Sequence, residues 1–131
     1  AGLDGIEIYR EFARRVLKSR QDLLELVISA RQRNQTVVGV GCPGRASTLL
    51  NYVGLSPELL PYIAEQSTSL KLGLFLPGLH VPIVDEERML SEQPDYAIML
   101  SWHYADPIIS KLREKGLRSK IVIPLPEVTV Q

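Results

Sequence analysis

The sequence predicts an α/β fold: a mostly parallel sheet of five strands between two layers of helices, preceded by a long N-terminal helix. Short apolar and β-branched runs alternate with amphipathic segments, which is the pattern of strand–helix–strand units. A glycine-rich turn lies between the first such run and the following helix, as in Rossmann-like three-layer sandwiches. The 131 residues are enough for one domain with a real core, so we expect residues 1–131 to form a single domain.

A long helix is expected over residues 6–33. Apolar side chains such as Phe12 and Val16 recur there every three or four positions, and no proline or glycine follows Gly5 in this range. Most of the charged residues fall on other faces of the helix, and Asn34 ends it. We expect helix 6–33 to pack on the sheet through its apolar stripe.

The remaining elements follow from the same two periodicities. Strands are expected at the apolar runs 36–40, 62–65, 81–84, 96–101 and 120–124. Helices are expected at 45–53, 86–91 and 106–115. Pro82 keeps the third strand out of a central position in the sheet, because proline lacks the N–H that an inner strand donates. The natural strand order for such a chain is 3-2-1-4-5.

Charge and cysteine content exclude several classes of protein. Fifteen basic and fifteen acidic residues give a formal net charge of +0, so no global field attracts nucleic acid or an anionic membrane. No run approaches the roughly 20 apolar residues that span a bilayer. Cys42 is the single cysteine, which excludes an internal disulfide and a structural zinc site and fits a reducing compartment. We expect a cytoplasmic protein with no metal, nucleic-acid or membrane partner.

The glycine-rich turn is the most informative stretch of the chain. Gly39, Gly41 and Gly44 form a G-x-G-x-x-G between a strand and a helix, where backbone N–H groups and the helix dipole favour a phosphate. Arg45 places a positive charge at the helix N-terminus, an arrangement that a nearby anion favours. Thr48 can donate to the phosphate or bond back to its own helix. The alternative is that these glycines only permit tight packing of strand against helix.

Two polar residues extend this candidate site. Asn51 lies one helical turn after Ser47, so its amide can reach a ligand or cap a loop. Glu65 lies 24 residues after Gly41 at the end of the second strand, where a dinucleotide-binding fold places the acid that binds a ribose diol. Glu65 therefore supports an alternative function, an NAD-type dinucleotide-binding module. Pro43 argues against it, because proline removes one N–H from the turn.

His80 and His103 are the two histidines of the chain. Each follows an expected strand or turn, where open α/β sheets bind their ligands. A histidine there can act as a general base or donate to a phosphate. The simpler interpretation is a structural, hydrogen-bonded histidine. We assign no catalytic residue and keep these two as candidates only.

Five blocks of sequence occur in an order that resembles one enzyme family. They are the glycine turn with its helix at 39–52, Leu-Pro-Gly-Leu-His-Val-Pro-Ile-Val at 76–84, Gln-Pro-Asp-Tyr at 93–96, Leu-Ser-Trp-His at 100–103 and Ile-Val-Ile-Pro-Leu-Pro at 121–126. Over about residues 6–126 they resemble the C-terminal domain of the S-adenosylmethionine-dependent sugar C-methyltransferases. Leu79 departs from the pattern, which has threonine there, and this loss of a hydroxyl allows a different substrate.

The resemblance implies what this chain contributes to methyl transfer. Enzymes of that family methylate a carbon of a nucleotide-linked keto-deoxysugar and bind S-adenosylmethionine in a separate, preceding domain. This chain is then expected to bind no cofactor, to contribute acceptor or diphosphate binding, and to be inactive without the methyl-donor domain. Its expected partners are a nucleotide-linked sugar or similar small acceptor and that preceding domain. A further alternative is a non-catalytic interaction domain that assembles through helix 6–33.

Overall fold

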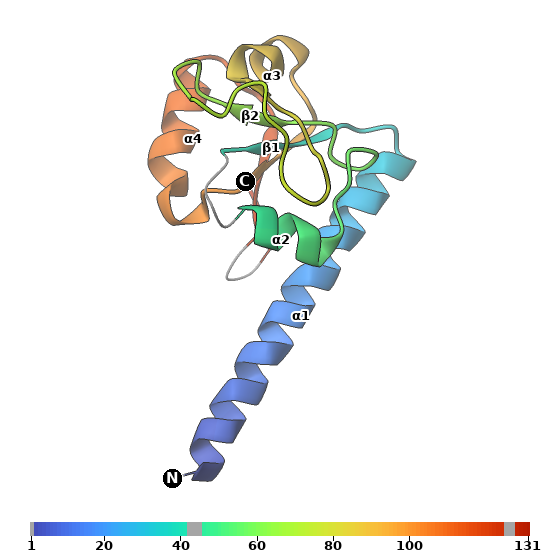
Figure 1. Ribbon diagram of the computed structural model, residues 1–131, viewed down its shortest axis with the longest axis vertical. Coiled ribbons are helices and arrows are strands. Elements are labelled where there is room, and N and C mark those ends of the chain that lie inside the picture. The colour runs from blue at the N-terminus through green and yellow to red at the C-terminus, as the bar shows by residue number, and fades with distance from the viewer. Residues whose placement is uncertain (1, 42–45, 125–127) are drawn as a thin grey trace.

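The computed structural model describes residues 2–41, 46–124 and 128–131 (Figure 1). Its helices are α1 (Gly2–Gln32), α2 (Ala46–Val53), α3 (Glu86–Glu92), α4 (Ala105–Glu114) and the short 3₁₀ helix η1 (Trp102–Tyr104). Its strands are β1 (Val37–Val40), β2 (Ile63–Glu65), β3 (Ile83–Asp85), β4 (Tyr96–Met99), β5 (Lys120–Ile123) and β6 (Thr129–Val130). Every element expected from the sequence is present, with its ends shifted by at most a few residues. Of the elements in the described residues, only η1 and β6 were not expected.

The strands form one sheet in the order β3-β2-β1-β4-β5-β6. The first five run parallel to their neighbours, and β6 pairs antiparallel with β5. This arrangement confirms the expected Rossmann-like α/β sandwich and the strand order 3-2-1-4-5. β6 adds a sixth strand, which the sequence did not indicate because two residues are too short to show a periodicity.

β3 forms an edge of the sheet, as Pro82 requires. This proline lies directly before the first residue of β3, where its missing N–H breaks no inner ladder. Its carbonyl oxygen still accepts a hydrogen bond from the Ile63 N–H at 2.9 Å. At Pro82 the chain is therefore hydrogen-bonded to β2 only through this carbonyl oxygen.

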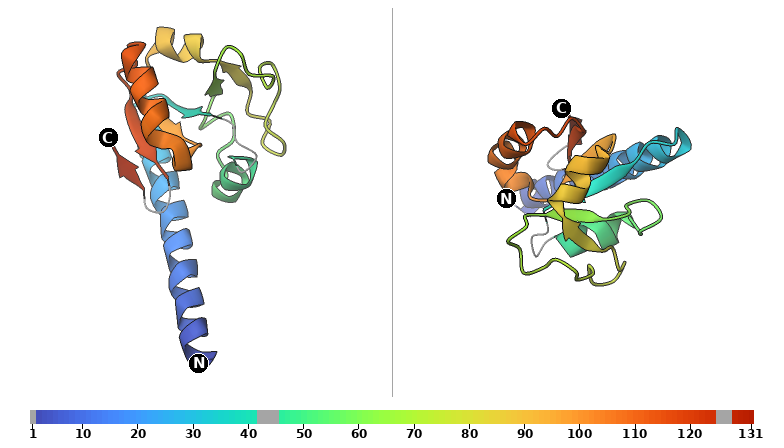
Figure 2. Two further views of the ribbon diagram at one scale, coloured as in Figure 1. Left: turned by 90° about the vertical axis from the view of Figure 1, so that its left-hand side faces the viewer. Right: turned by 90° about the horizontal axis from the view of Figure 1, so that it is seen from above.

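Helices cover both faces of the sheet and bury one apolar core under each (Figure 2). The core beneath α1 and α2 includes Leu23 and Leu50, and the core beneath α3 and α4 includes Met89. Val37 and Val38, neighbours in β1, belong to different cores because successive side chains of a strand point to opposite faces. All four residues of β1 are buried, as expected for a central parallel strand.

α1 is longer than the body on which it packs (Figure 1). Buried side chains recur along one face from Ser19 to Ala30, and this second half contacts α2 and β1. From Gly5 to Arg15 every residue is exposed. Within the described residues, only the second half of the expected helix 6–33 packs on the body. The assignment of residues 1–131 to a single domain stays a prediction. No helix in the described ranges combines the length and apolarity that crossing a membrane requires.

Candidate functional site

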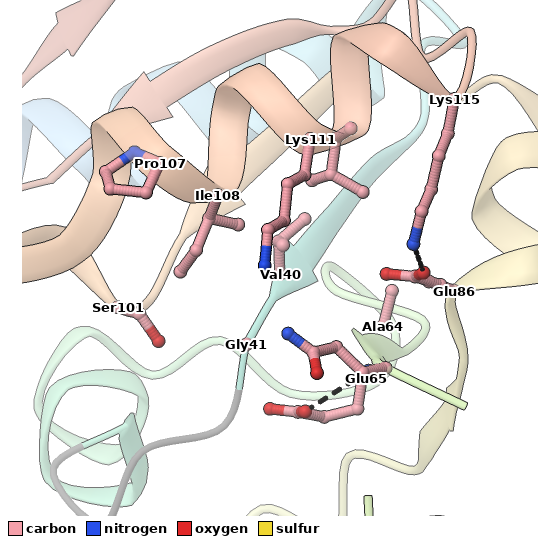
Figure 3. A pocket seen from close by; sticks show the side chains of 12 residues that line it. Val40, Gly41, Ala64, Glu65, Glu86, Ser101, Pro107, Ile108, Lys111 and Lys115 are labelled. Carbon is pink, nitrogen blue, oxygen red and sulfur yellow. Dashed lines mark hydrogen bonds and ion pairs between the residues drawn. The ribbon is translucent and has the colours of Figure 1, made fainter. Parts of the chain in front are cut away.

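A crevice opens at the edge of the sheet where the parallel strands end (Figure 3). It is lined by Gly41 after β1, Glu65 at the end of β2, Glu86 after β3 and Ser101 after β4, with α4 as the opposite wall. Its volume is about 180 Å³. β1 and β4 are neighbours whose following helices cover opposite faces of the sheet, and open α/β sheets bind ligands at such a switch point. This crevice is therefore the candidate site.

Gly41 forms the part of the crevice wall where β1 ends. Its φ of 79° is left-handed, a conformation that glycine adopts without strain. Its N–H donates to the Ala64 carbonyl oxygen at 2.9 Å. A Cβ atom at this position would lie 2.6 Å from the Ser101 Oγ. Glycine is therefore required both by the backbone and by the close approach of the two strand ends.

Gly39 is accounted for by packing inside the sheet. A Cβ atom there would lie 3.0 Å from the Leu100 Cδ1 and 3.2 Å from the Ile63 Cγ1. Gly39 is buried and does not line the crevice. The packing interpretation of the glycine-rich turn therefore explains Gly39, whereas Gly41 both packs closely and borders the candidate site.

The positive charge of the crevice comes from α4. The Lys111 side chain points into the crevice (Figure 3), and among the described residues it makes no hydrogen bond or ion pair. Lys115 is instead paired with Glu86 at the rim. The hydrogen bond to Glu86 and the charge of its carboxylate raise the pKa of Lys115 above its usual value. Lys111 is thus the crevice lysine that remains available to a bound anion.

Glu65 lies across the crevice from α4 (Figure 3). Its side chain is half-buried, and its Oε2 accepts a hydrogen bond from the Gln66 N–H at 3.3 Å. The sequence predicted this carboxylate for the end of the second strand, and the structure places it there, at the crevice. Glu65 and Lys111 give the two walls charges of opposite sign.

Asn51 holds a loop and does not line the crevice. Its Nδ2 donates to the Pro77 carbonyl oxygen at 3.1 Å. A Cβ atom on Gly78, which has a φ of 90°, would lie 2.4 Å from the Asn51 Oδ1. The structure thus shows the loop-capping interpretation of Asn51, and a contact between Asn51 and a ligand stays a prediction.

For three of the predicted site residues, Gly44, Arg45 and Thr48, the structure describes no contact. Gly44 and Arg45 lie outside the described residues, and so does Cys42. Thr48 belongs to α2, but its side chain is not among those described. The phosphate contacts predicted for Gly44, Arg45 and Thr48 therefore stay predictions.

Neither histidine lines the crevice. His80 precedes β3, so it lies toward the amino end of that strand, away from the edge where the crevice opens. Its φ is 59°, and its N–H donates to the Leu76 carbonyl oxygen at 2.9 Å. His103 lies in η1, beyond the carboxyl end of β4, with its ring centroid 5.4 Å from that of Trp102. Across the described ranges, no group of three or more His, Cys, Asp or Glu side chains could hold a metal ion.

Sequence reasoning missed Ser101, Glu86 and Lys111. Ser101 carried a signal, because it stands at the end of a predicted parallel strand and such strands share a carboxyl edge. Glu86 carried a weaker one, as the first residue of a predicted helix. Lys111 carried none, because its helix bears several charged residues and only packing decides which of them faces the crevice.

The fold and the crevice together define a Rossmann-like α/β domain with a candidate site at its switch point. Residues 1–126 match the family model described as the C-methyltransferase C-terminal domain, and the chain belongs to this family. It is 36% identical over 132 residues to the C-methyltransferase NovU of Streptomyces niveus. The match covers 98% of this chain but 31% of that relative, so the chain spans less than a third of the relative's length. The family resemblance predicted from the five sequence blocks is confirmed.

Proposed function

We propose that this chain holds the diphosphate of a nucleotide-linked sugar, or a similar small acceptor, beside the methyl-donor site of a C-methyltransferase. The observation that carries the proposal is the crevice at the switch point, where Gly41 forms one wall and Lys111 points in from the other. The Ser101 side chain packs against Gly41 in the same wall, and its hydroxyl can donate a hydrogen bond to an anion bound there. Lys111 supplies a positive charge with no competing partner among the described residues.

Arg45 and Thr48 complete the proposed anion site. Both follow Gly41 in the sequence, in the turn and in the first part of α2. A helix N-terminus offers unpaired N–H groups and a positive dipole end to a phosphate. We assign the charge of Arg45 and the hydroxyl of Thr48 to the same phosphate-binding role.

The size of the crevice supports a shared site. Its volume of about 180 Å³ is below the roughly 300–1,000 Å³ of a pocket that encloses a whole small-molecule ligand. It suits a pair of phosphates better than a complete nucleotide-linked sugar or a complete S-adenosylmethionine. We therefore assign the rest of the acceptor pocket, and S-adenosylmethionine as methyl donor, to another domain of the protein. On this proposal the chain alone transfers no methyl group.

A titration followed by NMR tests this function. The same labelled sample receives TDP, a TDP-sugar, S-adenosylmethionine and NAD in turn, and amide shifts are mapped onto the chain. We expect shifts at Gly41, Glu65 and Ser101 with the two TDP compounds and none with S-adenosylmethionine. Saturable binding of S-adenosylmethionine, or no shift with either TDP compound at millimolar concentration, contradicts the proposal.

A matched pair of lysine variants locates the anion. Lys111→Gln removes the crevice cation, whereas Lys18→Gln removes an exposed lysine on α1 that pairs with Asp22 outside the crevice. A charge-assisted contact at an exposed site implies that Lys111→Gln raises the TDP Kd by roughly three- to tenfold. Lys18→Gln should leave the Kd unchanged. Equal effects of the two variants on the Kd would mean that TDP binding depends only on the overall charge of the chain.

NAD-type dinucleotide binding is the second candidate, and the position of Glu65 favours it. This carboxylate lies at the end of β2 and lines the crevice, where a dinucleotide-binding fold places its ribose acid. The same titration separates the two functions. Shifts with NAD alone that disappear in Glu65→Gln would support the second candidate against the first.

A further inference from the structure

The first half of α1 carries an apolar face that nothing in the described structure covers. We define this exposed stripe as Ile8, Tyr9 and Phe12. Ile8 and Tyr9 are each 71% exposed and Phe12 is 63% exposed. Large apolar side chains grouped in this way on a helix mark an interaction surface more often than a solvated one.

The exposed stripe continues the face by which α1 packs on its own domain. Tyr9, Phe12 and Val16 are spaced by three and four residues, and Leu23 follows Val16 after seven. These spacings keep all four side chains on one face of a helix. Leu23 is buried against the body, whereas Tyr9 and Phe12 are not. The face of α1 that packs on the body from Ser19 onward is therefore open at Tyr9 and Phe12.

The face of α1 turns from buried to exposed at the point where the helix extends past the body. Arg20 donates from its Nε to the Tyr52 carbonyl oxygen at 2.9 Å and stacks over the Tyr52 ring at 5.2 Å, which joins α1 to α2. From Gly2 to Lys18 the helix extends beyond this contact by roughly 25 Å at 1.5 Å per residue. The same projection is visible in Figure 1, where the N-terminal end of α1 stands clear of the sheet. Most of the stability of a helix in a protein comes from packing of its apolar face, and within the described residues this half of α1 lacks such packing.

We propose that the exposed stripe is the docking surface for the domain that precedes this one in the C-methyltransferases. The family is named as a C-terminal domain, and 69% of the relative NovU lies outside the match, which spans 31% of it. Residues that precede Gly2 in a longer protein emerge at the projecting end of α1. A preceding domain is thus tethered beside the exposed stripe, and it packs along the half of the helix that this domain leaves open.

The small area of the exposed stripe favours a tethered occupant over a second copy of the chain. Its aromatic residues, at about 150–250 Å² each when fully buried, bring the area to a few hundred Å². A stable complex between separate proteins buries about 800 Å² per partner. A tethered domain needs less, because its effective concentration next to α1 is of millimolar order. The exposed stripe is therefore sufficient for a contact within one protein.

Hydrogen exchange tests this docking in the longer protein and in the present chain. We expect the amides of residues 5–18 to exchange at least tenfold more slowly in the longer protein. The variant Tyr9→Ala/Phe12→Ala should abolish that protection, whereas Arg10→Ala/Arg14→Ala on the opposite face should keep it. All four sites are exposed and alanine favours helix, so both variants retain α1. Circular dichroism of each variant verifies that the helix is intact.

Two outcomes overturn the proposal. The first is equal exchange of residues 5–18 in the two proteins, which means that the exposed stripe stays uncovered. The second is protection in the present chain alone that rises with its concentration, together with a dimer in sedimentation. That result identifies a second copy as the occupant. Neither outcome depends on ligand binding at the crevice, so this test and that of the proposed function fail independently.

Discussion

A Cβ atom on Gly41 would lie 2.6 Å from the Ser101 Oγ, so the ends of β1 and β4 meet with no room for a side chain on the first. Because the Gly41 φ of 79° is also unfavourable for other residues, Gly41→Ala should lower the free energy of unfolding by roughly 2–4 kcal/mol. Urea denaturation measures this loss. Ser101→Ala in the same chain should recover part of it, because the Oγ is the nearest atom.

Gly54→Ala provides the control for this prediction. Gly54 has a similar φ of 84°, but a Cβ atom there would have no atom within 4 Å. It isolates the backbone strain, which we expect at about 1 kcal/mol. If Gly41→Ala and Gly54→Ala lower the free energy of unfolding by the same amount, the overlap with the Ser101 Oγ does not contribute to the loss.

Asn51→Ala should loosen the loop that carries Pro77 and Gly78. The variant removes the hydrogen bond from the Asn51 Nδ2 to the Pro77 carbonyl oxygen. We expect a loss of about 1 kcal/mol in the free energy of unfolding, and faster hydrogen exchange at the His80 N–H, which bonds within the same loop. Unchanged exchange at His80 would show that Asn51 does not hold the loop. Unaltered TDP affinity in this variant would count against the predicted ligand contact of Asn51.

Tyr62 makes the stability of the fold sensitive to high pH. Its hydroxyl donates to the Glu92 Oε1 at 2.9 Å, and burial together with this hydrogen bond raises the pKa of Tyr62 well above its usual value of 10.0. A raised folded-state pKa gives stability that is fully present below the unfolded pKa and is lost as the pH rises above it. Above about pH 10, the wild-type unfolding free energy should fall more steeply than that of Tyr62→Phe, by up to about 1.4 kcal/mol per pH unit. Parallel curves for the two proteins would contradict the raised pKa.

Glu86→Gln should strengthen anion binding at the crevice. Glu86 is paired with Lys115, and its carboxylate places a negative charge at the rim. Removing that charge releases Lys115 toward the crevice, so the Kd for inorganic diphosphate should fall by roughly two- to fivefold at low salt. Titration at low and at high ionic strength measures this. Glu114→Gln, which removes an α4 carboxylate that does not line the crevice, should change the Kd less, and equal changes would argue against a local effect.

The sequence was a reliable guide to the elements and their order because each strand and helix carries a complete local pattern. The buried run Val37–Val40, the stripe of α1 and the glycine turn each predict their element without reference to the rest of the chain. It was a poorer guide to the site. Gly41 and Glu65 were predicted and border the crevice, but Ser101 and Lys111, which complete it, come from segments 60 and more residues after Gly41.

The sequence by itself determined the α/β fold, the strand order 3-2-1-4-5 and the family, since these depend on periodicity and on motifs in order along the chain. Only the tertiary structure decided which residues share the crevice, that Asn51 turns to a loop, and that the apolar face of α1 stays open at Tyr9 and Phe12. The physical reason is that a local pattern fixes the face of an element. Which residues contact that face depends on the positions of segments distant in the sequence, and the packing of the whole chain sets those positions.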